Sequence, residues 1–143
     1  MKKLIVAVLM LSGITCFARN INISKVPEPV KYTFYKNFPE VKEAKWEMEH
    51  GKYEANFEKD GQNQSAIFDE NGKWLETETH LDPRMLPAKI VMYVKNNYDG
   101  HKIKEAAKLT MPNGETMYEA EVKCMDLMFD ANGKFIKAIC KKD

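Results

Sequence analysis

The stretch FDENGKW at residues 68–74 returns as FDANGKF at residues 129–135. Asn-Gly-Lys between two apolar runs is typical of a β-hairpin, because glycine readily takes the positive φ that such a turn needs. A three-residue loop closed by a glycine bulge predicts that Phe68 pairs with Trp74, and Phe129 with Phe135. The residues expected to form these two turns are Asp69, Asn71 and Gly72, and Asp130, Asn132 and Gly133.

The similarity between the two halves extends well beyond this phrase. Val26-Pro27 aligns with Leu86-Pro87, and Tyr53-Glu54-Ala55 aligns with Tyr118-Glu119-Ala120, always in the same order. Self-similarity at a fixed period indicates a duplicated structural unit. We therefore predict two repeats, residues 24–81 and 82–141, within one domain at residues 19–143.

Each repeat is expected to begin with a short helix and to continue as four strands. Apolar residues recur every fourth position in the helical segments, which places them on one stripe. The stripes are Val30, Phe34 and Phe38 in the first copy, and Ile90, Val94 and Tyr98 in the second. Helices of about three turns are marginal alone in water, so they must dock on the strands. Hairpin connections predict an antiparallel sheet of roughly eight strands, an α+β fold.

The first 18 residues have the pattern of an export signal. Lys2 and Lys3 precede an apolar run, and Cys16-Phe17-Ala18 supplies a small-x-small cleavage pattern. A lipid anchor on Cys16 is the alternative. Cleavage near Ala18 leaves 20 basic and 21 acidic side chains, a formal charge of −1. We expect a periplasmic or secreted protein with no membrane span after cleavage and no basic field for nucleic acid.

Two cysteines remain after the expected cleavage, Cys124 and Cys140. The hairpin register derived from Phe129 and Phe135 sets Cys140 opposite Cys124. In an oxidising compartment this arrangement predicts a disulfide. The alternative is a pair of small buried thiols.

The sequence contains no recognisable catalytic or cofactor-binding pattern. Ser24 and Ser65 lack the glycines of a nucleophile elbow, and no phosphate-cradling glycine loop occurs. The three histidines, His50, His80 and His101, fall at separate predicted turns or strand ends. The Asp-x-Asn-Gly turn lacks the first acidic ligand and the distal glutamate of a calcium loop. We expect no enzyme activity, no cofactor and no metal site.

Aromatic residues offer a possible contact site. Helices on one face of a sheet leave the other face to solvent unless something binds there. In the fourth strand of the first repeat, Trp74, Glu76, Glu78 and His80 alternate along one face, and Trp46 has a similar setting. Exposed aromatic side chains on a sheet mark an interaction surface. Trp46, Trp74 and His80 are therefore candidate partner-binding residues; the alternative is that the tryptophans face the helices.

These features together resemble the exported PepSY-like, beta-lactamase-inhibitor-like proteins. The resemblance is carried by the signal segment, the proline-led helices (27–38 and 87–98), the Tyr-Glu-Ala strands and the two Phe-Asp-x-Asn-Gly-Lys hairpins. It covers almost the whole exported chain. It implies one long curved antiparallel sheet with two helices on a single side, and it transfers no inhibitory residue.

The function expected from these observations is a non-enzymatic periplasmic binding module. It would engage a periplasmic or cell-envelope protein through the open sheet face, as an inhibitor or a regulator. The alternative is a carrier of a small ligand or metal held between the sheet and the helices.

Overall fold

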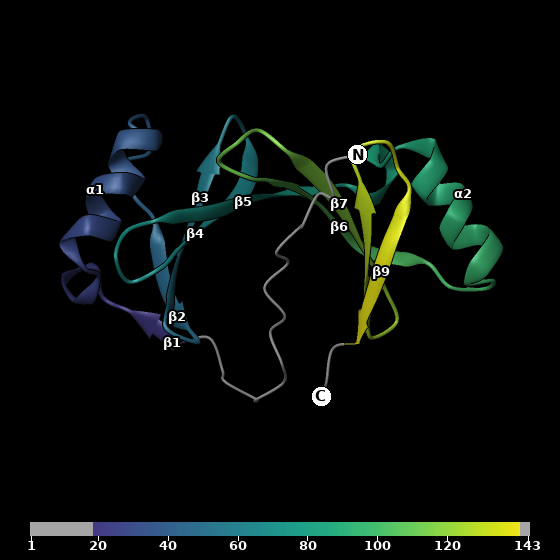
Figure 1. Ribbon diagram of the computed structural model, residues 1–143, viewed down its shortest axis with the longest axis horizontal. Helices are drawn as coiled ribbons and strands as arrows, with labels where there is room; N and C mark the ends of the chain where they lie inside the picture. The colour runs from purple at the N-terminus through teal and green to yellow at the C-terminus, as the bar shows by residue number, and fades with distance from the viewer. Residues whose placement is uncertain (1–18, 141–143) are drawn as a thin grey trace, which may run out of the picture.

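The computed structural model describes residues 19–140, which form one antiparallel sheet and two helices (Figure 1). Nine strands follow one another in sequence order across the sheet. They are β1 (Arg19–Ile21), β2 (Lys45–Glu49), β3 (Lys52–Lys59), β4 (Gln62–Phe68), β5 (Trp74–Leu81), β6 (Ile103–Thr110), β7 (Thr116–Val122), β8 (Met125–Asp130) and β9 (Phe135–Cys140). The strand beyond the predicted eight is β1, which pairs with β2 at the sheet edge.

The two helices are α1 (Glu28–Asn37) and α2 (Ala88–Asn97), and each follows a short 3-10 turn. These turns are η1 (Ile23–Lys25) and η2 (Pro83–Met85). A proline immediately precedes each helix, where its missing N–H costs nothing and its fixed φ suits the first turn. The predicted helical segments are confirmed, together with their apolar stripes.

The repeated phrase forms the hairpins β4–β5 and β8–β9. Phe68 pairs with Trp74, and Phe129 pairs with Phe135, as the turn pattern predicts. The Asp69 N–H donates to the Lys73 carbonyl at 3.0 Å, and the Asp130 N–H bonds the Lys134 carbonyl at 2.9 Å. In each turn the aspartate Oδ1 also accepts two backbone N–H groups, each at 2.9 Å.

Removing that aspartate should weaken the hairpin. We expect Asp69→Ala to lower the free energy of unfolding by about 1 kcal/mol, because the loop loses two side-chain to backbone hydrogen bonds. Denaturant unfolding measures this change. Glu70→Ala, at the exposed neighbouring position, is the control and should be neutral. Equal effects of the two substitutions would show that the Asp69 hydrogen bonds do not stabilise the turn.

The glycine of each phrase lies against the start of a helix. A Cβ on Gly72 would lie 2.5 Å from the Pro29 carbonyl oxygen, and one on Gly133 would lie 3.1 Å from Lys89 Cβ. Each hairpin corner therefore packs against the first turn of a helix. At Gly72 the backbone of Pro29 leaves no room for a Cβ, whereas at Gly133 the Lys89 side chain would have to shift by a few tenths of an ångström.

The core lies between the helices and one face of the sheet. Phe34 of α1 is fully buried and its ring lies within 5.5 Å, centroid to centroid, of Phe38, Trp46 and Phe57. A second cluster lies between α2 and the sheet and includes Ile90 of that helix. The other buried residues of the α1 cluster are Val26, Val30, Val41, Ala55, Ala66 and Phe68, and those of the α2 cluster are Leu86, Val94, Ala106, Ala120, Val122, Leu127 and Phe129.

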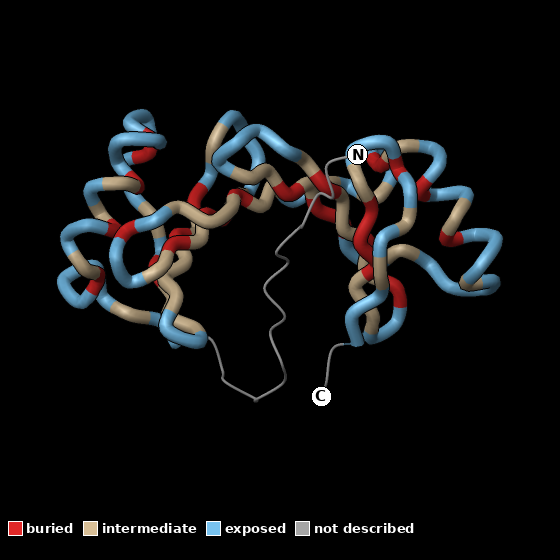
Figure 2. The backbone as a smooth tube through the Cα atoms, in the orientation of Figure 1, coloured by how far each residue is buried: buried red, intermediate tan, exposed pale blue. Residues whose placement is uncertain are grey.

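Strand register places both helices on the same face. Ala66, in the core beneath α1, pairs with Thr77 of β5, and Leu81 pairs with Ala106 beneath α2. Thr77 and Leu81 are four residues apart on one strand, so their side chains point the same way. Figure 1 shows the sheet bent into an arch with α1 and α2 at its two ends on the outer side, and Figure 2 shows buried residues where the helices meet the strands. Among residues 19–140, no helix covers the inner side.

Candidate functional site

The inner side of the arch, termed the open face, is formed by the side chains that alternate with the core residues. One row of cross-strand partners on this face consists of Glu47, Glu54, Ile67 and Glu76, in the order of β2 to β5. The next row runs from Lys45 through Asn56, Ser65 and Glu78 to Leu109. On β2 to β5 the members of the open face are Lys45, Glu47, Glu49, Lys52, Glu54, Asn56, Glu58, Asn63, Ser65, Ile67, Glu76, Glu78 and His80. Most of these side chains are polar, and acids outnumber bases.

The carboxylates of Glu54, Glu76 and Glu78 on this face are partly desolvated. Burial raises the pKa of Glu54, and nearby Glu47 and Glu49 raise it further, while a hydrogen bond with Ser65 opposes the rise. Burial also raises the pKa of Glu76, with Lys52 opposing. These carboxylates are therefore held in positions that disfavour their charge.

Glu78 joins the same group from the next position facing this way on β5. Burial raises its pKa, and the charges of Glu54, Glu76 and Asp126 act in the same direction. His80 opposes this rise, with its Nε2 4.0 Å from Glu78 Oε1. Glu54, Glu76 and Glu78 are called the carboxylate triangle below.

The carboxylate triangle should make stability depend on pH. A raised native-state pKa means that the folded chain takes up protons at a higher pH than the unfolded chain, so its stability falls as pH rises. We expect the melting temperature to increase on acidification from about pH 7 toward about pH 5. Hydrogen bonds with Lys59 and Arg84 lower the pKa values of Glu40 and Asp82, that of Asp82 to about 2. The stability that these two carboxylates contribute is lost only when the pH falls below their ordinary pKa values of 4.5 and 3.8.

The matched variant for this test is Glu54→Gln/Glu76→Gln/Glu78→Gln. It should be more stable than the wild type at neutral pH by about 0.5–1 kcal/mol, because it removes the charge of Glu54, which directly opposes Glu47 on the neighbouring strand, and the partly buried charges of Glu76 and Glu78. Its melting temperature should rise less on acidification. Scanning calorimetry at several pH values gives both results, and identical pH profiles for the two proteins would contradict the assignment.

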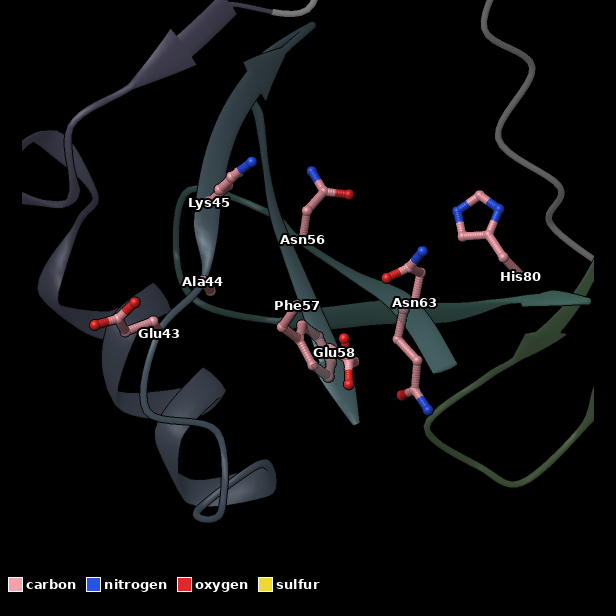
Figure 3. A pocket seen from close by; sticks show the side chains of 9 residues that line it. Glu43, Ala44, Lys45, Asn56, Phe57, Glu58, Asn63 and His80 are labelled. Carbon is pink, nitrogen blue, oxygen red and sulfur yellow. The ribbon is translucent and has the colours of Figure 1, made fainter. Parts of the chain in front are cut away.

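A hollow of about 600 Å³ opens near the carboxylate triangle, since its lining residues Asn56 and His80 lie two positions beyond Glu54 and Glu78 on the same strands. Figure 3 shows the side chains that line the hollow. Its lining includes Lys45 of β2, Asn56 of β3, Asn63 of β4 and the exposed His80 of β5. Carboxamide groups together with side chains of either sign can donate and accept hydrogen bonds there. Ala44 and Phe57 also line the hollow, so it presents polar and apolar groups side by side.

The two tryptophans do not belong to this surface. Trp46 is only 3% exposed and packs in the core beneath α1, so its prediction as a contact residue is wrong. Trp74 is half-buried on the same side, and its Nε1 donates to Thr77 Oγ1 at 3.1 Å. For Trp74 the reason is a β-bulge: Ile67 pairs with Glu76 but Phe68 pairs with Trp74, so Leu75 is an extra residue. The bulge turns Trp74 toward the helix and leaves His80 on the open face.

A second bulge overturns the argument for a disulfide. Met128 pairs with Lys137 and Phe129 with Phe135, so Ile136 is an extra residue and the register beyond it shifts by one. Cys140 therefore faces Met125 instead of Cys124. In the structure Cys124 and Cys140 are free, exposed thiols.

Neither a metal-binding cluster nor a membrane-spanning helix occurs in the part of the chain that the structure describes. Residues 19–140 contain no group of three or more histidine, cysteine, aspartate or glutamate side chains placed to hold a metal ion. No helix among these residues has the length and apolar character that spanning a membrane requires.

The sequence matches the beta-lactamase-inhibitor-like, PepSY-like family over residues 13–65 and 51–137. The chain belongs to this family. No protein of curated function matches it. The resemblance inferred from the hairpins and proline-led helices is thus confirmed.

Solved structures share the PepSY-like fold. A DUF2874 family protein from Bacteroides ovatus ATCC 8483 aligns with a TM-score of 0.71 at 21% identity, covering 80% of this chain and 86% of the other. A protein from Bacteroides eggerthii DSM 20697, described as periplasmic, aligns with a TM-score of 0.70 at 15% identity, covering 80% and 88%. A BLIP-like protein from Bacteroides fragilis NCTC 9343 aligns with a TM-score of 0.67 at 25% identity, covering 82% and 89%.

The carboxylate triangle of this PepSY-like chain is not predicted by local sequence patterns. Alternation along one strand places Glu76, Glu78 and His80 on one face, but Glu54 lies two strands away. Only the register of β3, β4 and β5 brings Glu54 beside Glu76, on either side of Ile67. The available signal was the alternation of Glu54 with Tyr53 and Ala55, which already predicts a polar side for β3.

Proposed function

We propose that the protein is a non-enzymatic binding module of the periplasm that engages a protein partner through the open face, as an inhibitor or a regulator. The observation that carries this proposal is the one-sided cover of the sheet. Both helices pack on the outer side of the arch (Figure 1), and the inner side is left uncovered, with mostly polar side chains on β2 to β5. A sheet face without a covering layer is a ready site for a partner.

The comparisons support the same proposal. The family is described as beta-lactamase-inhibitor-like, and a structural neighbour at 25% identity is described as BLIP-like. The neighbour described as periplasmic supports the compartment. The export signal expected at residues 1–18 lies outside the described residues and remains part of the proposal.

The two halves of the chain are further proposed to be copies of one unit, residues 24–81 and 82–141. In each half a 3-10 turn and a helix precede four strands, and the Asp-x-Asn-Gly hairpin closes the last pair. A second copy would lengthen the sheet and so enlarge the open face.

The alternative role, a carrier of a ligand between sheet and helices, finds no support in the packing. Rings fill the space beneath α1: Phe34 and Phe68 are fully buried, and Phe34 lies edge to face with Trp46. Beneath α2 the rings of Tyr93 and Phe135 stack at 4.8 Å. A ligand there would have to displace close-packed side chains.

Site-specific photo-crosslinking tests the proposal. A photoreactive residue replaces His80 on the open face, and the same residue replaces Tyr32 or Met92, which are 69% and 61% exposed on the helices. In the cells that make the protein, we expect a discrete adduct with one protein from position 80 and none from positions 32 and 92. Adducts only from the helix positions would refute the open face as the contact surface.

A further inference from the structure

Acidic side chains gather on the open face of β2, β3 and β5. Glu47 pairs directly with Glu54, and Glu54 and Glu76 flank Ile67 of β4 on either side. The directly opposed like charges of Glu47 and Glu54 destabilise the sheet, and the charges of Glu54 and Glu76 also act against each other. The folded chain thus carries a repulsion that a cationic partner would relieve.

The dimensions of the carboxylate triangle favour more than one positive charge. Glu54 and Glu76 stand on strands two apart, so their backbones are roughly 10 Å from each other. Glu76 and Glu78 are alternate residues of one strand, about 7 Å apart. Glutamate side chains are long enough to bridge such distances, but among residues 19–140 no three such side chains are placed to hold one metal ion.

The floor next to the triangle is apolar. Glu78 pairs with Leu109, and Leu109 pairs with Met117, on the side of the sheet away from the helices. Both belong to a separate buried cluster with Ala107 and Met128. Lysine and arginine combine a long aliphatic stem with a charged end, so they suit a surface where carboxylates adjoin aliphatic side chains.

We propose that the open face binds an extended basic segment of a protein partner, with lysine or arginine side chains at alternate positions seated among Glu54, Glu76 and Glu78. This inference rests on the proposed function and specifies its partner. In an extended chain alternate side chains are about 7 Å apart, which matches the spacing of Glu76 and Glu78. Charge-assisted hydrogen bonds to arginine or lysine would replace the repulsion among the carboxylates.

Calorimetric titration of the chain from Arg19 onward tests the inference. The probe is a synthetic decapeptide with lysine and threonine alternating, and its control replaces lysine by glutamate. We expect the lysine peptide to bind and the glutamate peptide not to bind. The Glu54→Gln/Glu76→Gln/Glu78→Gln variant should bind the lysine peptide about tenfold more weakly or worse, as expected when partners of charged hydrogen bonds are neutralised.

A second triple variant controls for net charge. Glu70→Gln/Asp99→Asn/Glu115→Gln removes the same charge from exposed connections outside the strands. It should bind the lysine peptide like the wild type. Equal weakening by the two variants, or no binding by the wild type, would overturn the inference. So would equally tight, triangle-dependent binding of calcium or spermine, which would identify a small cation as the ligand.

Binding should also weaken as the pH falls from about 7 to about 5, where lysine keeps its charge while the carboxylates begin to protonate. The titratable and charged groups around the triangle are Glu47, Glu49, Lys52, His80 and Asp126. The triangle variant should show a smaller pH effect than the wild type. Equal effects would contradict the role of the triangle.

The inference and the proposed function fail in different ways. Crosslinks from position 80 that persist at full yield in the triangle variant would refute the basic segment and leave the open face as the contact surface. Thermal unfolding of each variant separates these results from a folding defect, because the glutamines should not lower the melting temperature.

Discussion

Replacement of Phe34 by alanine is expected to lower the free energy of unfolding by about 3–5 kcal/mol, the range for deleting a large buried aromatic side chain. Phe34 is fully buried, and its ring meets Phe38, Trp46 and Phe57 at 5.2–5.4 Å between centroids. Its removal would leave a cavity where α1 contacts the sheet. Domains of this size are stable by about 5–15 kcal/mol, so a large share of the total would be lost.

Denaturant unfolding of Phe34→Ala beside Tyr32→Ala measures this effect. Tyr32 lies on the same helix and is 69% exposed, so its loss should change stability by less than about 0.5 kcal/mol. Similar small effects of the two substitutions would mean that α1 does not depend on the sheet for its stability.

Replacement of Gly72 by alanine is expected to cost about 3 kcal/mol or more, from a left-handed backbone and from overpacking. Gly72 has a φ of +82°, and its added Cβ would lie 2.5 Å from the Pro29 carbonyl oxygen and 2.6 Å from the carbonyl carbon. Backbone atoms cannot rotate away as a side chain can. Either the hairpin corner or the first turn of α1 would have to move.

The matched control is Gly61→Ala. Gly61 has a similar φ of +74°, but a Cβ there meets nothing within 4 Å, so only the backbone cost of about 1–2 kcal/mol applies. Gly133→Ala should fall between the two, because its nearest contact is a side-chain carbon at 3.1 Å. Thermal unfolding ranks the three variants. Equal losses at positions 61 and 72 would show that contact with Pro29 adds nothing.

Local sequence signals predicted the elements well because each signal acts within a few residues. The Asn-Gly turns determined the pairing of Phe68 with Trp74, and a step of four residues identified the buried side of α1. The prolines at positions 27 and 87 marked the beginnings of the helices. None of these inferences required knowledge of distant contacts.

The surface was harder to predict because it depends on register over several strands. A period of two identifies the residues that share a face only while no bulge intervenes. Leu75 and Ile136 interrupt that period, which moved Trp74 to the helix side and Cys140 away from Cys124. The proximity of Glu54 to Glu76 likewise requires three strands in register.

Titration of individual carboxyl groups, followed by NMR of the side-chain carboxyl carbons, tests most directly whether Glu54, Glu76 and Glu78 are crowded and desolvated on the open face. We expect midpoints above the ordinary 4.5 for these three and a midpoint below it for Glu40, which pairs with Lys59. Midpoints at or below 4.5 for all three would contradict this crowding and show that the three carboxylates are well solvated.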